Sequence, residues 1–340
     1  MTFPSKPQFH QRPRTFSSIE IDQFARLSFD RKCEQFHEGT RPFAAFILNI
    51  SGELQMVSFA SCSAREVNPR MLATSKSKDQ VIHRHPVVLA RRALIRYLLK
   101  EAKRRETGDV VSIFIVNDEG DLQLHPSCQL YLYSTYPYIC ENVVMGLEAM
   151  APHDTNHCFM NKMRRWNVLG LQGALLSNIF APVHISKVVY GTAPPIPNAD
   201  IWRLLFGQLN IKDREMSFDS IEEPSTKFIS DFSKEDFVPR PKIAPIVWFQ
   251  GLTGLDKIGE NGRLLEREVG SSVCKQEIFK AYLQLARAEK RILKYSRAKK
   301  MAGHYQLLKK ILYKKWEIQR NGKWLKRKSN KADKFWVDLA

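Results

Sequence analysis

The pattern of apolar positions predicts a helix at the start of the chain and a strand pair directly after it. Between Ile19 and Phe36, apolar residues recur at helical spacing behind two serines that suit a helix N-cap. Two apolar runs follow, Pro42 to Ile50 and Leu54 to Cys62, and Ser51-Gly52 separates them. We therefore expect two strands joined by a tight turn.

Further along the chain, helices and strands are expected to alternate. The segment from Val87 to Arg104 predicts a long amphipathic helix whose basic face lies opposite its apolar one. The runs Val110 to Asn117 and Gln129 to Ser134 are short, apolar and β-rich, which is typical of central strands. A helix that begins near Ala174 and a strand from His184 to Tyr190 continue the series. This alternation predicts an α/β layered fold.

The C-terminal half is less regular. Pro194 to Pro245 is rich in proline, serine and acidic residues, and it predicts exposed connections with one helix near Ile201 to Leu209. Helical patterns return at Lys275 to Ala288 and at Ala302 to Lys314, where aromatic and basic residues are interleaved. We expect these basic C-terminal helices to extend the α/β layers, either packed on them or standing beside them.

The net charge narrows the class of partner. A formal charge of +18, from 53 basic and 35 acidic residues, favours an anionic partner. The charge is concentrated, because Cys274 to Phe335 holds 20 basic and 4 acidic residues, whereas Asp213 to Asp236 is acidic. One concentrated cationic region is therefore expected, rather than a diffuse basic surface for nucleic acid.

Other general features indicate compartment and organisation. The six cysteines are scattered without a CxxC pair, which is typical of a reducing compartment. Residues 1–18 are basic but lack a following apolar run, so we expect a flexible tail there and a single domain over residues 19–335. No stretch approaches the roughly 18 apolar residues of a membrane span, so no membrane partner is expected.

Two strings of residues are specific enough to indicate a family. The first is His85-Pro86-Val87-Val88-Leu89-Ala90-Arg91-Arg92, and the second runs from Lys162 to Gly173 as KMRRWNVLGLQG. They resemble the catalytic domain of the double-stranded-RNA adenosine deaminases, the ADAR family. That domain has His-Ala-Glu before a helix with an Arg-Arg pair, and later Lys-x-x-Arg-Trp-Asn-Val-x-Gly-x-Gln-Gly. The resemblance extends from about Ile19 to Arg327 and implies a cytidine-deaminase-like layered sheet with helices.

The resemblance also implies that the catalytic set is degenerate. In such deaminases a His and two Cys hold a zinc ion that activates water, and a Glu moves protons. His85 matches the ligand, but Val87 stands at the Glu position, and Tyr138 and Phe159 stand at the two Cys positions. We therefore expect neither deamination nor a resident zinc ion. A displaced metal site remains an alternative, but it would lack a base; the nearby candidates for it are Cys140, His153, His157 and Cys158.

The same family buries an inositol hexakisphosphate among basic and aromatic side chains. The resemblance implies that this chain binds it through Arg91, Arg92, Lys162, Arg165, Trp166, Gln172, Tyr295, Lys299, Tyr305, Lys309, Trp324 and Arg327, and that a loop cation near Lys257 or Arg263 adds to them. Cations that face one another repel unless a polyanion lies among them. Arginine forks and lysine ammonium groups form charge-assisted bonds with phosphate. The alternative is that these charges form an ordinary solvated helix face.

The interval between the two lost cysteine positions bears on function. Tyr138 to Phe159 contains Gly146-Leu147-Glu148 but lacks the Gly-Glu-Gly segment with which editing family members enter the RNA duplex, so base flipping is also expected to be lost. No double-stranded-RNA-binding domain is recognised either. The resemblance then implies a pseudo-deaminase scaffold, which binds an active ADAR-family deaminase as a hetero-oligomer and regulates its editing activity, stability or localisation.

Two alternatives to the scaffold stay open. One is an RNA-binding pseudo-deaminase, which competes for or protects editing sites through its basic C-terminal surface. The other is an enzyme with a rebuilt zinc site. In the scaffold interpretation, double-stranded RNA is contacted indirectly, through the partner. Nuclear residence is expected from family habit and from the basic run Lys323 to Lys331.

Overall fold

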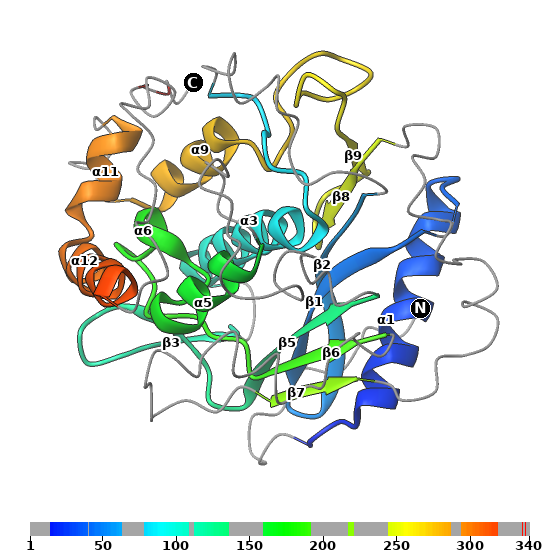
Figure 1. Ribbon diagram of the computed structural model, residues 1–340, viewed down its shortest axis with the longest axis horizontal. Coiled ribbons are helices and arrows are strands. Elements are labelled where there is room, and N and C mark those ends of the chain that lie inside the picture. The colour runs from blue at the N-terminus through cyan, green and yellow to red at the C-terminus, as the bar shows by residue number, and fades with distance from the viewer. Residues whose placement is uncertain are drawn as a thin grey trace.

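A mixed sheet of seven strands forms the middle layer of the structure, which is a computed structural model (Figure 1). In spatial order its strands are β7 (Ser217–Ser220), β6 (Lys187–Tyr190), β5 (Cys128–Ser134), β1 (Phe43–Ile50), β2 (Glu53–Ser61), β8 (Ile246–Phe249) and β9 (Asp256–Lys257). Strand β6 pairs in parallel with β5 and β7, and the other neighbours are antiparallel. The residues that the structure describes are 14–39, 41–62, 78–108, 112–135, 159–191, 217–220, 244–286, 294–318, 335 and 337.

The predicted strand pair is confirmed as the antiparallel hairpin of β1 and β2. Its turn places two residues in the left-handed region, Ser51 at a φ of 52° and Gly52 at a φ of 94°. The side-chain oxygen of Asn49 supports this turn by accepting a hydrogen bond of 2.9 Å from the Gly52 amide. Because β1 also pairs with β5, the hairpin lies at the centre of the sheet, where both faces of its strands are buried.

Helix α1 (Ser18–Gln35) covers one face of the sheet and confirms the first predicted helix. A capping box starts it, because the Ser17 hydroxyl accepts from the Glu20 amide and the Glu20 carboxylate accepts from the Ser17 amide. Its buried residues recur every fourth position: Ile21, Ala25, Phe29 and Cys33. Phe29 stacks on Phe43 of β1 with the ring centroids 3.9 Å apart, which fixes the helix over the sheet.

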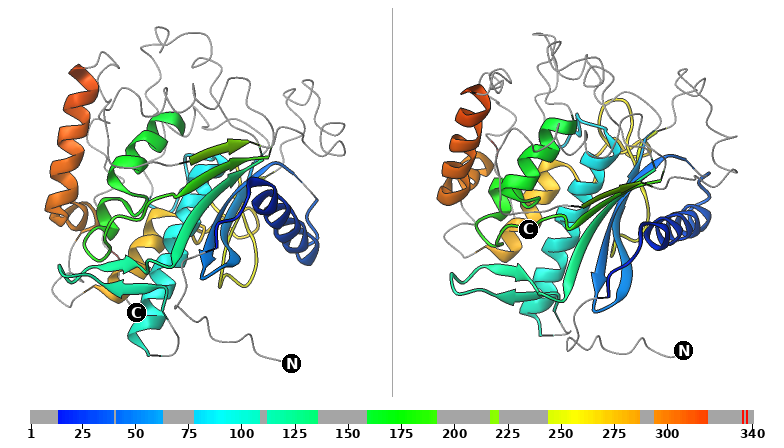
Figure 2. Two further views of the ribbon diagram at one scale, coloured as in Figure 1. Left: turned by 90° about the horizontal axis from the view of Figure 1, so that it is seen from below. Right: turned by 60° about the horizontal axis from the view of Figure 1, so that its bottom comes forward.

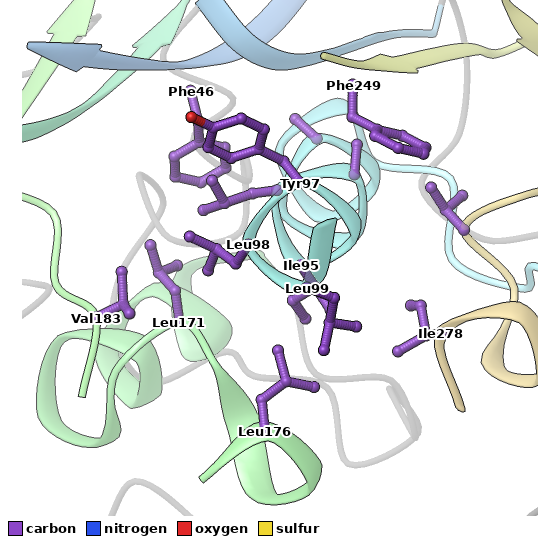
Figure 3. Close-up of a cluster of buried hydrophobic side chains, with 14 of the residues drawn as sticks. Phe46, Ile95, Tyr97, Leu98, Leu99, Leu171, Leu176, Val183, Phe249 and Ile278 are labelled. Carbon is purple, nitrogen blue, oxygen red and sulfur yellow. The ribbon is translucent and has the colours of Figure 1, made fainter. Parts of the chain in front are cut away.

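Helix α3 (Pro86–Glu106) lies on the opposite face and forms the centre of the larger core. Figure 3 shows its side chains pointing both toward the sheet, beside Phe46 and Phe249, and away from it, beside Leu171 and Leu176. The predicted helix is confirmed. Other helices cover its basic side around Arg91, Arg92 and Arg96, which are half-buried, whereas the basic residues of its last turn are exposed.

The outer layer consists of α5 (Phe159–Leu169), α6 (Gly173–Leu176) and α9 (Lys275–Leu285), which lie against α3 (Figure 2). Beyond them lie α11 (Tyr295–Met301) and α12 (Gly303–Ile318). A small apolar cluster joins α12 to α5 and α6; its buried members are Leu169, Ala174, Ala302, Tyr305 and Leu312. The basic C-terminal helices therefore pack on the α/β layers, and the predicted α/β fold is confirmed.

The C-terminal end of the described chain returns to the start of α11. The carbonyl of Phe335 accepts a hydrogen bond of 3.1 Å from the Tyr295 amide. The two aromatic rings stack with their centroids 5.0 Å apart, and Phe279 of α9 meets both rings edge-on. This aromatic group fastens the start of α11 to α9.

One predicted central strand is wrong. Of the described residues 112–117, only Phe114–Val116 forms a strand, β3, and it pairs with β4 (Leu122–Leu124) in a separate two-stranded sheet. The reason is local, because the Asn117 side chain accepts a hydrogen bond of 2.7 Å from the Asp121 amide and turns the chain back on itself. The resulting hairpin leaves Val116 exposed.

Several elements differ from the expected pattern in smaller ways. The helix near Ala174 is a single turn, and the strands from Gln129 and His184 are confirmed as β5 and β6. The helix expected near Ile201 to Leu209 lies outside the described residues. No described helix combines the length and the apolar composition that crossing a bilayer requires.

Candidate functional site

Basic and aromatic side chains from four helices gather on the side of α3 that faces away from the sheet. Two come from each of α3, α5 and α11, and three come from α12. We call this set the cation cluster; its members are Arg91, Arg92, Arg165, Trp166, Tyr295, Lys299, Tyr305, Lys309 and Tyr313. Eight of these nine are among the residues that the sequence predicted as polyphosphate ligands, and they come from three separated segments of the chain.

Arg91 lies at the centre of the cation cluster. Its Cζ lies 5.1 Å from the centroid of the Trp166 ring, and its Nη2 donates to the carbonyl of Leu171. Gly173 permits this close approach, because a Cβ there would lie 2.8 Å from Nη2 and the glycine φ is +69°. Burial, together with the smaller effect of the nearby charge of Arg165, lowers the pKa of Arg91 to about 9.

Arg165 on α5 has aromatic hydroxyl neighbours. Burial by itself would lower the pKa of Arg165, but Tyr305 and Tyr313 outweigh it and raise the pKa. The Tyr313 hydroxyl also forms a hydrogen bond with the Arg165 side chain. Tyr313 was missed in the sequence, although it follows Lys309 by one helical turn and Tyr305 by two. That spacing places all three residues on one face of α12.

The two lysines of the cation cluster lie over aromatic rings. Lys299 Nζ is 5.0 Å from the centroid of Tyr295, and Lys309 Nζ is 5.5 Å from the centroid of Tyr313. Such cation–π contacts stabilise an ammonium group only modestly. Burial raises the pKa of Tyr313, so its phenol is neutral near pH 7 and does not cancel the positive charge of the lysine above it.

The buried donors of the cation cluster that find no acceptor among the described residues include Arg91 Nε and Trp166 Nε1. The groups that shift the pKa of Arg91 are arginines and tyrosines, and none of them is a carboxylate. Buried charge that lacks compensation costs several kcal/mol per ion. A polyanion with several acceptor oxygens would satisfy both donors and compensate the charge, so the residues fit a phosphorylated ligand.

Four predicted ligands stand apart from the cation cluster. The Gln172 amide is buried and holds the backbone, since it donates to the Leu169 carbonyl at 2.8 Å and accepts from the Val183 amide at 3.1 Å. Lys162 lies within electrostatic range of His85. Trp324 and Arg327 lie outside the described residues.

The two loop cations considered in the sequence are engaged with carboxylates. Lys257 Nζ forms an ion pair of 2.8 Å with Glu38, and Arg263 Nε forms one of 2.8 Å with Asp79. The Asp79–Arg263 pair joins the loop after β9 to the segment before α3. These partners account for the charges of both loop cations within the described chain.

His85 is the N-cap of α3 and is buried. Its Nδ1 accepts a hydrogen bond of 3.2 Å from the Val87 amide. Burial lowers the pKa of His85 well below its usual value, and the positive charge of Lys162 adds to this, so the imidazole is neutral near pH 7. Val87 is fully buried in the first turn of α3. An apolar side chain at this place cannot exchange a proton with a substrate.

The remaining degenerate positions are described only in part. Phe159 begins α5, but its side chain is outside the described residues, and so is all of Tyr138. Cys140, His153, His157 and Cys158 are outside them as well. Within the described ranges, no three His, Cys, Asp or Glu side chains are grouped to hold a metal ion. The expected lack of zinc stays a prediction.

Comparison with known proteins adds two findings. A family model described as adenosine-deaminase (editase) domain matches residues 70–137 and 158–328. The chain is also similar to a Drosophila melanogaster protein, "Double-stranded RNA-specific editase Adar", with 26% identity over 176 residues. That alignment covers 49% of this chain and only 25% of the fly protein. The matched ranges include the first turn of α3 and every member of the cation cluster.

Proposed function

The chain belongs to the adenosine-deaminase (editase) domain family, and on that premise we propose that it is a catalytically inactive scaffold. In this proposal it binds an active ADAR-family deaminase and regulates that enzyme's editing activity, stability or localisation. The proposal that the chain is inactive depends on one observation. Val87, which is fully buried, stands at the position where the family has its proton-transferring Glu. The partner is proposed because a folded domain without chemistry still offers a rigid binding surface.

The environment of Val87 supports inactivity beyond the residue type. Neighbouring His85 is neutral, and its Nδ1 accepts the hydrogen bond from the Val87 amide that caps α3. A deaminase needs a group that takes a proton from the attacking water and returns it to the leaving amine. Within the first turn of α3, no described side chain is a carboxylate that could take that role.

We further propose that inositol hexakisphosphate fills the cation cluster as a structural component. Its phosphate oxygens would accept from Arg91 Nε and Trp166 Nε1, and Arg165, Lys299 and Lys309 would compensate its charge. When bound, the ligand supplies only negative charge and acceptor oxygens. These residues lie on α3, α5, α11 and α12, so the ligand would hold four helices together.

The scaffold is tested by purifying the tagged chain from its native source and identifying what accompanies it by mass spectrometry. A stoichiometric deaminase is the expected result. RNA without a protein partner would instead favour the pseudo-deaminase that competes for editing sites. The nuclear localisation proposed from Lys323 to Lys331 is tested in the same cells by changing Lys326, Arg327 and Lys328 to Ala.

Inactivity is tested separately on the purified chain. We expect no conversion of adenosine to inosine in duplex RNA and less than one zinc per chain by elemental analysis. Conversion that is abolished by His85→Ala would overturn the proposal, because it would show that the ancestral site works. Full zinc occupancy would instead favour the alternative of a displaced metal site that involves Cys140 or Cys158.

A further inference from the structure

Helix α12 has a second face, which points away from the rest of the molecule. Leu307 and Ile311 lie one helical turn apart on it, and their side chains are 56% and 44% exposed. Tyr305 and Leu312 occupy the opposite side of the helix and are buried. Figure 2 shows α12 at the outside of the helical layer. The exposed aliphatic pair is therefore separate from the cation cluster.

Lysines flank this aliphatic pair. On a helical wheel Lys310 and Lys314 fall on one side of the pair and Lys315 falls on the other, and all three lysines are exposed. Within the described residues, none of these three lysines forms an ion pair. Residues 294–315 include no Asp or Glu at all. We call Leu307, Lys310, Ile311, Lys314 and Lys315 the outer face of α12.

The composition of the outer face decides what class of partner fits it. A phosphate backbone would pair with the lysines but would gain nothing from covering two aliphatic side chains. A bilayer would bury the aliphatic side chains, but two of them give little apolar area for insertion. A protein segment with aliphatic residues between carboxylates would satisfy both features at once. Helices pair in this way, with aliphatic residues along a seam and opposite charges flanking it.

We propose that the outer face of α12 binds an acidic amphipathic helix of a protein partner. Its aliphatic side chains cover Leu307 and Ile311, and its carboxylates pair with Lys310, Lys314 and Lys315. This inference rests on the scaffold function proposed above, because it takes the partner to be a protein. It adds the kind of segment by which that partner binds and the place on this chain where it binds.

The apolar part of the proposal is tested with a fluorescent designed helical peptide that has leucines along one side and glutamates flanking them. Binding to the full chain is followed by anisotropy. Changing Leu307 and Ile311 together to Ser should weaken binding by about tenfold or more. The matched control changes Ile19 and Leu27 of α1 to Ser in the same way. These two side chains are 58% and 59% exposed, and the control should bind the peptide as tightly as the parent chain does. Equal binding by both double variants and the parent chain would overturn the proposal.

The charged part is tested by exchanging charge between the two binding partners. Lys310→Glu with Lys314→Glu should lose the acidic peptide and should bind a peptide in which lysines replace the glutamates. A merely structural role of these lysines would not produce this rescue. The control pair, Lys103→Glu with Arg105→Glu at the exposed end of α3, should keep the original preference. Failure of the rescue would overturn the proposal.

Duplex RNA and anionic phosphatidylserine vesicles are measured alongside the peptide. If either binds the parent chain more tightly than the peptide does, and depends on Lys310 and Lys314 but not on Leu307, the outer face is a phosphate-binding surface and the proposal is wrong. The opposite ranking, with binding that depends on both kinds of residue, supports it.

The same variants separate this inference from the scaffold function. If an active deaminase copurifies equally well with the parent chain and with Leu307→Ser plus Ile311→Ser, the scaffold stands and the outer-face proposal fails. If no deaminase copurifies but the acidic peptide binds and depends on both kinds of residue, the scaffold fails and the outer face stands.

Discussion

The first turn of α3 and the cation cluster one turn later are neighbours on one helix, yet their physical states are opposite. In the first turn, His85 is neutral and Val87 is apolar and fully buried, so nothing charged requires compensation. In the cation cluster, half-buried Arg91 lies beside Arg165, and its buried Nε finds no acceptor within the described residues. The difference teaches that a neutral, apolar turn is stable without a counter-charge, whereas a desolvated set of cations requires one.

The largest expected effect comes from reversing two charges of the cation cluster. Lys299→Glu with Lys309→Glu should cost about 5 kcal/mol or more, because two acidic groups would face the phosphates of the proposed ligand. That is comparable with the whole stability of a typical domain, so the protein should be insoluble or unfolded. Soluble yield and thermal unfolding measure this outcome.

The matched control moves each substitution by one residue, to Lys300→Glu with Lys310→Glu. Both of these lysines are exposed, so the variant should fold like the parent chain. If the two double variants are equally stable, and phosphate analysis of the parent finds no bound polyphosphate, the cation cluster is an ordinary basic surface. The contrast between the two regions of α3 then disappears.

A smaller effect is expected when the family's carboxylate is restored in the first turn, as Val87→Glu. Burial of this polar group should cost about 3 kcal/mol, measured by urea unfolding. Burial raises the pKa of the new carboxyl above its unfolded value of about 4.3, so the folded state holds its proton more tightly. The cost should therefore be larger at about pH 7.5 than at about pH 5. A variant as stable as the parent that also deaminates adenosine would show that only this residue had been lost.

The smallest effect concerns His85, whose pKa is lowered by burial and by Lys162. Below about pH 6.5 the unfolded chain takes up a proton at this position and the folded chain does not, so the parent should lose about 1.4 kcal/mol per pH unit there. His85→Asn keeps an N-cap acceptor but removes this loss. The stability difference between variant and parent should thus shift in favour of the variant between about pH 7.5 and pH 5.5. A difference that does not change with pH would contradict a neutral, metal-free imidazole.

The sequence predicted those parts of the fold whose causes are local. The turn at Ser51 and Gly52, the four-residue periodicity of α1 and the apolar length of α3 all depend on residues close in sequence. The missed helix α11 has no such local signal, because the side chain of its N-cap, Lys294, makes no capping hydrogen bond. The last turn of α11 is held from outside instead, by Asn178, which donates to the Ala298 carbonyl, and by Gln306, which donates to the Lys299 carbonyl.

For the candidate site, too, the sequence predicted some features and missed others. Motif spacing predicted eight of the nine members of the cation cluster, because those residues resemble a known pattern. It could not predict that Gln172 would be occupied with the backbone at Leu169 and Val183, since that depends on how the loop folds back. Nor could it predict which other helices would cover the basic side of α3, because whether a helix face meets solvent or another helix is decided by tertiary packing.

The wide spacing of the cation cluster along the chain has a consequence for biosynthesis. A ribosome delivers Arg91 and Arg165 long before it delivers Lys299 and Lys309, so the growing chain carries an incomplete set of cations during most of its translation. The early arginines must stay hydrated until α12 arrives, and their burial belongs to the last stage of folding. If the proposed polyphosphate fills the cation cluster, its supply in the cell would limit how much finished protein accumulates, independently of how much messenger RNA is present.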